Sequence, residues 1–302
     1  MELPAIGIIG GAGVFGLEGF DHLEEHDIDT PFGKPSCSLM GGEVHGRKVW
    51  FLARHGIGHR IMSHEVNHRA NIWALRSLGV RWLISVSTVG SLREEVAPRC
   101  ILLNDQFFDR TSTRQQHTFF GEGIVAHIEF SEPVTNELHE IFAEAAAEVE
   151  ADFHKGGTYV CIDGPAFSTR AENVVYRSYG FDAVGLTTLP EAKLARESEM
   201  AFVSMATVAA YDCWRPGGGK IDPMDLGKNL AFNLRTGTKV ITEAIKNIPH
   251  VANWDAHNHL DVAIFTQRHL WPEETIERIR PILGKRVPQL SDLEEECQSL
   301  QA

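Results

Sequence analysis

The chain has 302 residues, of which 43% are hydrophobic and 23% are charged, as expected for a soluble globular protein. Its formal net charge of −13 disfavours binding to a nucleic-acid backbone or to an anionic membrane surface. The five cysteines are widely spaced with no C-x-x-C pair, and we find neither a basic-then-apolar leader nor an apolar run of membrane length, so we expect a cytoplasmic protein without a disulfide framework.

Short β-rich runs alternate with amphipathic segments along the chain. Buried strands are predicted at 6–9, 49–53, 82–86, 100–103, 158–162 and 202–209. Helices are predicted at 66–78, 136–150, 170–179, 191–197 and 224–248, with one more near 273–282. This alternation predicts an α/β fold whose sheet is largely covered by helices.

The first strand leads into a glycine-rich loop, GAGVFG at 11–16, which fits the dinucleotide-binding pattern G-x-G-x-x-G. A dinucleotide fold would continue with a helix and a second parallel strand that ends in an acid. The chain continues instead through DTPFGKPS into two β-like runs around GGEVHGRK, which indicates a hairpin. We interpret the loop as one that binds a small anion through backbone N–H groups, with a simple tight turn as the alternative.

Two further strand ends carry groups suited to an anion. Arg54 and His55 follow the run at 49–53, where Arg offers a fixed charge and a planar fork and His offers a hydrogen bond. Ser87 and Thr88 follow the run at 82–86 and offer hydroxyl donors.

A fourth anion element is the segment GLTTLPEAKLARE. Thr188 and Glu191 fit a T-x-x-E capping box, and Pro190 lies just inside the predicted helix. This places Thr187 at a helix N-terminus, where anions are favoured. Together with the glycine loop, these elements predict a site for inorganic phosphate or a phosphoryl group.

The histidines at 55, 59, 64 and 68 allow a metal-site interpretation. Glycines at 56 and 58 disfavour a shared helical face for the first two, and no matching Cys or carboxylate pattern accompanies them. We therefore expect no metal.

Ten motifs along the chain together resemble those of one enzyme family. In order they are IGIIGGAG, DTPFGKPS, LARHGIGHRI, VNHRANIWALRSLG, STVGSLREE, DQFFDRTSTR, HIEFSEP, DGPAFSTRAE, TTLPEAKLARE and AAYDCW. They resemble the 5'-methylthioadenosine phosphorylases and the related methylthioinosine and purine nucleoside phosphorylases, over about residues 5 to 250. RQQHTFFGEG and HRANIWAL are more similar to the methylthioinosine type, and FSTRAE and YDCW to the methylthioadenosine type.

The resemblance implies a single α/β domain with a mixed, partly barrel-like central sheet flanked by helices. The nucleoside phosphorylase-like domain would span 1–250, and a C-terminal extension, 251–302, would pack on the same domain. The family implies a homotrimer with sites near subunit interfaces. It implies phosphorolysis, with a small-molecule nucleoside and inorganic phosphate as substrates and no metal or organic cofactor.

The resemblance also implies roles for individual residues. The phosphate site would comprise Gly11, Arg54, His55, Ser87, Thr88 and Thr187. The nucleoside site would comprise Val89, Gly90, Phe167, Gly185, Leu186, Ala210, Asp212 and His117, the last approaching a neighbouring subunit's site. Asp212, beside the base edge, and His55 would be the catalytic residues.

Three positions depart from the family pattern. The opening loop of the family normally reads G-G-T-G or G-G-S-G, whose hydroxyl contacts phosphate, whereas this chain has Ala12; the lost hydrogen bond would cost about 1.5–3 kcal/mol. Ala210 stands where methylthioadenosine enzymes have a first Asp and 6-oxopurine types have Asn. Leu186 replaces the usual Met, a swap that nearly conserves volume.

We therefore predict phosphorolysis of a purine nucleoside of the 5'-deoxy-5'-methylthio type, giving the free base and (methylthio)ribose 1-phosphate, with base recognition altered by Ala12 and Ala210. The alternatives are a related enzyme acting on a different nucleoside or by another reaction, and a non-catalytic nucleoside-binding homologue. For the C-terminal tail, apolar spacing at 260–265 predicts simple packing on the domain.

Overall fold

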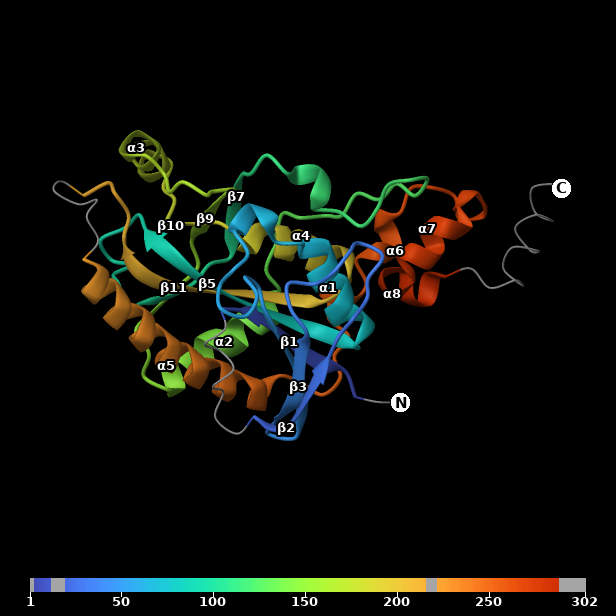
Figure 1. Cartoon of the computed structure of the whole chain (residues 1–302), viewed down its shortest axis with the longest axis horizontal. Coiled ribbons are helices and arrows are strands. Elements are labelled where there is room, and N and C mark those ends of the chain that lie inside the picture. The colour runs from blue at the N-terminus through green and yellow to red at the C-terminus, as the bar shows by residue number, and fades with distance from the viewer. Residues whose placement is uncertain (1–2, 12–19, 216–221, 288–302) are drawn as a thin grey trace.

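The computed structural model describes residues 3–11, 20–215 and 222–287. Its strands form one eleven-stranded sheet (Figure 1). They are β1 (Ala5–Gly10), β2 (Asp21–His26), β3 (Leu39–Val44), β4 (Arg47–Ala53), β5 (Val80–Ser91), β6 (Ile101–Leu103), β7 (Gln106–Arg110), β8 (Phe153–Lys155), β9 (Thr158–Ile162), β10 (Ala183–Gly185) and β11 (Ala201–Tyr211). The helices are α1 (His68–Ser77), α2 (Asn136–Glu148), α3 (Arg170–Ser178), α4 (Thr188–Glu197), α5 (Pro223–Asn247), α6 (Leu260–Ala263), α7 (Glu273–Arg278) and α8 (Arg280–Leu283).

Parallel and antiparallel strands are mixed in the sheet. The main path runs β2-β3-β4-β1-β5-β10-β9-β7, and β11, β6 and β8 branch from β5. β1 is parallel to both β4 and β5, while β3 and β4 form the antiparallel hairpin expected around GGEVHGRK. The predicted α/β class, with a mixed central sheet flanked by helices, is confirmed.

The long strand β5 changes partners halfway along one edge. β1 pairs with this edge only as far as Ser85, and β10 joins it at Gly90. On the opposite edge, β11 pairs in parallel from Trp82 to Ser91. The edge segment between the two partners therefore faces an opening in the sheet. The prediction that the strand ends at 86 is wrong, and Ser87 and Thr88 lie inside β5.

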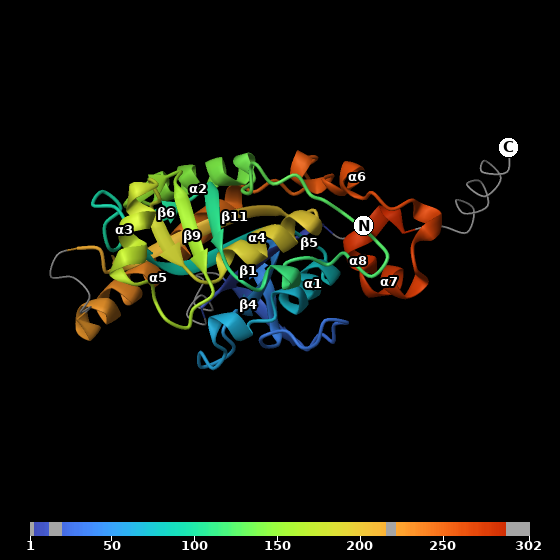
Figure 2. The same cartoon turned by 90° about the horizontal axis from the view of Figure 1, so that it is seen from above.

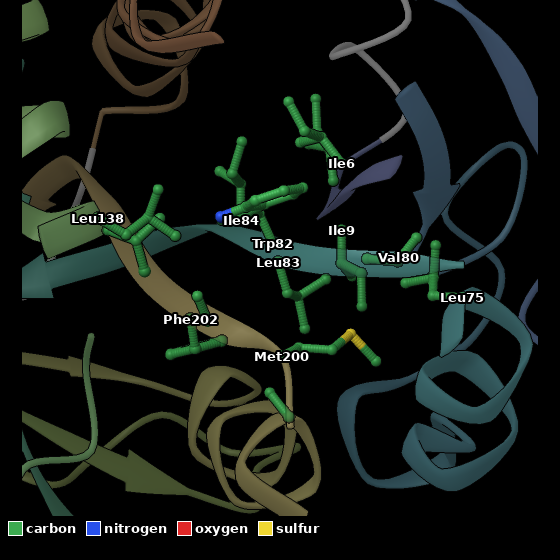
Figure 3. Close-up of a cluster of buried hydrophobic side chains, with 14 of the residues drawn as sticks. Ile6, Ile9, Leu75, Val80, Trp82, Leu83, Ile84, Leu138, Met200 and Phe202 are labelled. Atoms are coloured by element: carbon green, nitrogen blue, oxygen red, sulfur yellow. The ribbon is translucent and has the colours of Figure 1, made fainter. Parts of the chain in front are cut away.

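The main hydrophobic cluster is built from β1, β4, β5 and β11 with α1, α2 and α5 (Figure 3). A Cβ atom on Gly7 would lie 2.9 Å from Val80 Cγ1, 3.3 Å from Leu83 Cδ1 and 3.4 Å from Leu75 Cδ2. Gly7 thus lets side chains of α1 and β5 close over β1. Each aliphatic side chain buried there contributes about 1.5–3 kcal/mol.

The helices cover the sheet in pairs: α2 and α5 pack on each other and on β11, and α1 and α4 pack on each other and on β5 (Figure 1). The predicted helices at 136–150, 170–179 and 224–248 are confirmed within two residues. α4 begins three residues earlier than predicted, and the helix expected near 273–282 is two short helices, α7 and α8. No helix within the described ranges is both long and apolar enough to cross a membrane.

The segment after α5 packs at one end of the molecule, beside α1 (Figure 2). Leu260, Ile282 and Leu283 are buried in the main cluster. Val262 and Phe265, by contrast, are 86% and 68% exposed, so the apolar spacing at 260–265 does not correspond to a single buried face.

Candidate active site

A cavity of about 790 Å³ opens where the carboxyl ends of β1 and β4 meet the exposed edge of β5. The parallel register places the ends of β1 and β4 side by side, and the Arg54 N–H donates to the Gly10 carbonyl at 2.9 Å. Eight of the residues predicted for the site line this cavity: Gly11, Arg54, His55, Ser87, Thr88, Phe167, Leu186 and Thr187. Ala12 lies outside the described residues.

Arg54 is buried against Glu191 of α4. Nε of Arg54 donates to Oε1 of Glu191 at 2.5 Å, and Nη2 donates to Oε2 at 2.9 Å. Ser85 Oγ donates to the same carboxylate at 2.6 Å. The predicted capping box is therefore wrong: the Glu191 side chain pairs with Arg54, and Thr187, the N-cap of α4, makes no side-chain cap hydrogen bond.

This pairing changes what Arg54 can offer an anion. Burial would raise the pKa of the Glu191 carboxyl, but the charge and hydrogen bonds of Arg54, with His68, lower it to about 2, so Glu191 is ionised. The guanidinium fork points at Glu191, Nη2 also lies 3.1 Å from Ser85 Oγ, and Nη1 donates to the Val86 carbonyl at 2.9 Å. Of the five N–H groups of Arg54, one on Nη1 is left for a ligand.

His55 lies beside Arg54 on the cavity wall. Its Nδ1 is 2.9 Å from the Ile61 carbonyl, and its ring centroid is 4.3 Å from that of His59. Burial lowers the pKa of His55 to about 4, with Arg54 and His59 acting in the same direction. The ring is therefore neutral near pH 7.

Ser87 and Thr187 complete the polar end of the cavity. The buried Ser87 hydroxyl interacts with the Tyr159 hydroxyl, and because a hydroxyl accepts as well as donates, it can accept from Tyr159 while it donates to a ligand. Thr187 is the N-cap of α4, whose helix dipole places partial positive charge at this end.

Four predicted residues gather beyond this cavity at the ends of β5 and β11. Ala210 pairs with Gly90 across the two strands, and Val89 precedes Gly90. A Cβ atom on Gly90 would lie 2.8 Å from Oδ2 of Asp212, so the glycine makes room for that carboxylate. Asp212 Oδ1 accepts hydrogen bonds from the Cys213 N–H at 2.6 Å and from Asn173 Nδ2 at 3.4 Å. None of the four lines the cavity; Thr88, next to Val89 in the chain, does.

The remaining predicted residues have different surroundings. Phe167 lines the cavity but is 76% exposed. Gly185 is buried beneath the Tyr159 hydroxyl, which lies 2.0 Å from the position of a Cβ atom on the glycine. His117 lines a second, smaller cavity of about 270 Å³, which shares Leu186 and Ser63 with the larger one.

Sequence reasoning missed one whole wall of the larger cavity, which α5 supplies. Its lining residues are Leu226, Leu230, Asn233, Leu234, Gly237, Thr238 and Ile241. The three leucines recur every four residues, the spacing of one helix face, but this pattern does not tell a core-facing stripe from a cavity wall. Leu230 and Leu234 are each 39% exposed, which marks the stripe as a cavity wall. No group of three or more His, Cys, Asp or Glu side chains in the described part of the chain is arranged to hold a metal ion.

Comparison with known proteins places this architecture among phosphorylases. The family model of the phosphorylase superfamily matches residues 5–246. The chain is 43% identical over 282 residues to S-methyl-5'-thioadenosine phosphorylase of Geobacter sulfurreducens, covering 93% of this chain and 99% of that protein. It is 45% identical over 280 residues to the same enzyme of Koribacter versatilis, covering 93% and 96%.

Solved structures of methylthioadenosine phosphorylases have the same fold as this chain. A methylthioadenosine phosphorylase from an antarctic soil metagenomic library superposes with a TM-score of 0.88 at 39% identity, covering 94% of this chain and 100% of that chain. Methylthioadenosine phosphorylase from Schistosoma mansoni in complex with tubercidin superposes with a TM-score of 0.78 at 31% identity, covering 85% and 96%.

Proposed function

Because this chain belongs to the S-methyl-5'-thioadenosine phosphorylase family of the phosphorylase superfamily, we propose that it cleaves a 5'-deoxy-5'-methylthio purine nucleoside with inorganic phosphate. It is a nucleoside phosphorylase, which is a pentosyltransferase. The products would be the free purine and methylthioribose 1-phosphate.

The observation that carries the proposal is the division of the larger cavity into two unlike parts. Arg54, His55 and Ser87 make one part of the lining polar, and leucines of α5 make another part apolar. A nucleoside whose sugar meets phosphate on one side and carries an uncharged thioether on the other matches this division.

In the proposed reaction a phosphate oxygen bonds to C1' of the ribose as the bond from C1' to the purine nitrogen breaks. The bonding electron pair leaves with the base, which takes up a proton. The Arg54 N–H, the Ser87 hydroxyl and the N-terminus of α4 would hold the phosphate in line for attack. Asp212, in its protonated form, would donate this proton to the departing base and would be reprotonated by water. Proton-transfer assistance of this kind contributes a factor of about 10² to 10⁴.

We further propose that base recognition is altered, because Ala210 places a methyl group beside Asp212 where a second carboxylate or an amide would stand. The variant Ala210→Asp tests this together with Ala12→Thr. A large gain in methylthioadenosine cleavage would support it, and no gain would count against it.

The assembly and cofactor proposals also follow the family. We propose a homotrimer, which the exposed Val262 and Phe265 support as an apolar surface for a neighbouring subunit. We also propose a cytoplasmic enzyme that needs no metal or organic cofactor. Light scattering gives the subunit number, and full activity after EDTA treatment and dialysis is the expected result for the cofactor proposal.

A chromatographic turnover assay tests the function. The protein is incubated with methylthioadenosine, methylthioinosine, adenosine, inosine or guanosine, each with and without phosphate. We expect base release only with phosphate, and fastest from a methylthio nucleoside. Release without phosphate would contradict phosphorolysis, and fastest release from a 5'-hydroxy nucleoside would contradict the proposed substrate class.

A further inference from the structure

The loop after β4 fixes the proton on the His55 ring. Gly56 and Gly58 adopt φ values of +69° and +80°, a conformation that glycine adopts without strain. The loop turns back so that the Ile61 carbonyl lies 2.9 Å from Nδ1 of His55. A carbonyl only accepts hydrogen bonds, so Nδ1 carries the proton and donates it.

The other ring nitrogen, Nε2, then carries a lone pair. The charged or titratable groups that face the ring are Arg54, His59 and Glu191. Burial, together with Arg54 and His59, lowers the pKa of His55 to about 4, although Glu191 and the hydrogen bond to the Ile61 carbonyl act in the opposite direction. In this neutral form Nε2 is an acceptor and cannot donate. It has no hydrogen-bond partner within the described ranges, and the ring lines the cavity.

The neighbouring groups at this end are donors. Ser87 presents a hydroxyl that can donate while it accepts from Tyr159, and Arg54 presents one N–H of a guanidinium whose charge Glu191 offsets. An anion here therefore meets one acceptor among several donors, with little uncompensated positive charge from Arg54. A fully deprotonated anion would place an oxygen lone pair against the lone pair of Nε2.

We propose that His55 recognises the protonated oxygen of hydrogen phosphate by accepting its P–OH hydrogen bond at Nε2. The inference rests on the proposed function for the location of phosphate. It makes His55 a specificity-determining residue: monohydrogen phosphate and arsenate, which carry an O–H near neutral pH, are accepted, and sulfate, which carries none, is disfavoured.

Anion competition at pH 7.5 tests the proposal on the full-length protein. Inhibition of phosphorolysis by sulfate and isothermal calorimetry with phosphate, arsenate and sulfate give the affinity ratios. We expect phosphate and arsenate to bind alike and sulfate to bind roughly tenfold or more weakly, the effect of one hydrogen bond to a charged group. Sulfate binding within twofold of phosphate would overturn the proposal.

Substitutions then assign the selectivity to His55. His55→Lys offers donors only, so the ratio of sulfate to phosphate affinity should rise at least fivefold, whereas His55→Gln, which can turn its amide oxygen to the ligand, should retain part of the selectivity. His250→Gln, on an exposed residue beyond α5, is the control and should keep the wild-type ratio. An unchanged ratio in His55→Lys would refute the assignment.

The imidazole ¹⁵N chemical shifts of wild-type protein give a test that needs no variant. We expect a protonated Nδ1 and an unprotonated Nε2 at pH 7.5; a proton on Nε2 would overturn the proposal. If the protein shows no phosphate-dependent turnover, the proposed function fails, but the calorimetric ratios and the tautomer still decide the role of His55.

Discussion

At the scale of single residues, the polar end of the cavity depends on the buried pair of Arg54 and Glu191. Glu191→Gln leaves the Arg54 charge buried without a counter-charge, and breaking a buried pair in this way typically costs about 3–5 kcal/mol. We expect that loss in the free energy of unfolding, measured with urea. We also expect the KM for phosphate to rise more than the KM for the nucleoside, because the guanidinium loses its anchor.

An exposed pair provides the matched control for this variant. Glu140 pairs with Lys155 at the surface, and Glu140→Gln should change stability by less than about 1 kcal/mol. Equal losses of unfolding free energy in the two variants would mean that burial does not increase the contribution of the Arg54–Glu191 pair to stability.

Glu197 is a buried carboxyl of a different kind, since no Lys, Arg or His of the described chain lies within ion-pair distance of it. Burial raises its pKa to about 7, although hydrogen bonds from the Phe119 N–H and the Thr118 hydroxyl act in the opposite direction. A carboxyl whose folded-state pKa exceeds its unfolded value of 4.5 contributes stability that is full below that value and is lost as the pH rises through about 7.

Glu197→Gln, which resembles the protonated acid, isolates this contribution from that of the other titrating groups. Relative to the variant, the wild-type protein should lose about 2–3 kcal/mol of unfolding free energy between pH 5 and pH 8. Urea denaturation at pH 5, 6.5 and 8 measures the difference. Parallel stability curves for the two proteins would contradict the pKa shift.

At the scale of elements, α5 is the part of the site that we expect to set preference for the 5' substituent. Leu230 lies on the cavity wall and is partly exposed, so Leu230→Asn should alter the pocket with a small loss of stability. We expect the ratio of kcat/KM for methylthioadenosine to that for adenosine to fall roughly tenfold, which is the usual effect on specificity of losing a small apolar contact. Lys239→Ala, on an exposed position of the same helix, should leave this ratio unchanged.

Elements with a strong local pattern were predictable, and elements defined by distant partners were not. The fully buried strands and the long helix α5 follow from apolar runs and helical spacing. β8 and β10 have three residues each and no run of large apolar residues, whereas β6, equally short, was predictable because it lies in the apolar run 100–103. Glu191 was misassigned because T-x-x-E describes a local cap, whereas its actual partner, Arg54, is 137 residues away in the chain. Because of the same separation in the chain, the sequence alone does not show that Arg54 has only one N–H group left for a ligand.

At the scale of the whole molecule, one buried carboxylate joins the C-terminal segment to the body of the domain. Glu199, between α4 and β11, accepts hydrogen bonds from Nη1 and Nη2 of Arg286 at 2.9 and 2.7 Å, and from the Leu260 N–H at 3.1 Å. Arg76 of α1 and Arg81 of β5 lie close enough for their charges to act on it. Two arginines from α1 and β5 and one from the C-terminal segment thus surround this carboxylate, and Arg286 also pairs with Asp261.

Glu199→Gln would leave these three arginines to repel one another in a poorly solvated region, so we expect a loss of about 3–5 kcal/mol in unfolding free energy. The segment 251–287 shares a hydrophobic cluster with the rest of the chain, so we expect the two to fold as one unit. Urea unfolding of the variant should then remain a single transition, with its midpoint shifted to a lower urea concentration. Glu277→Gln, whose partner Arg280 is exposed, should cost less than about 1 kcal/mol. Unfolding of Glu199→Gln in two separate steps would contradict this, because it would show that the C-terminal segment unfolds independently once its contacts with Glu199 are removed.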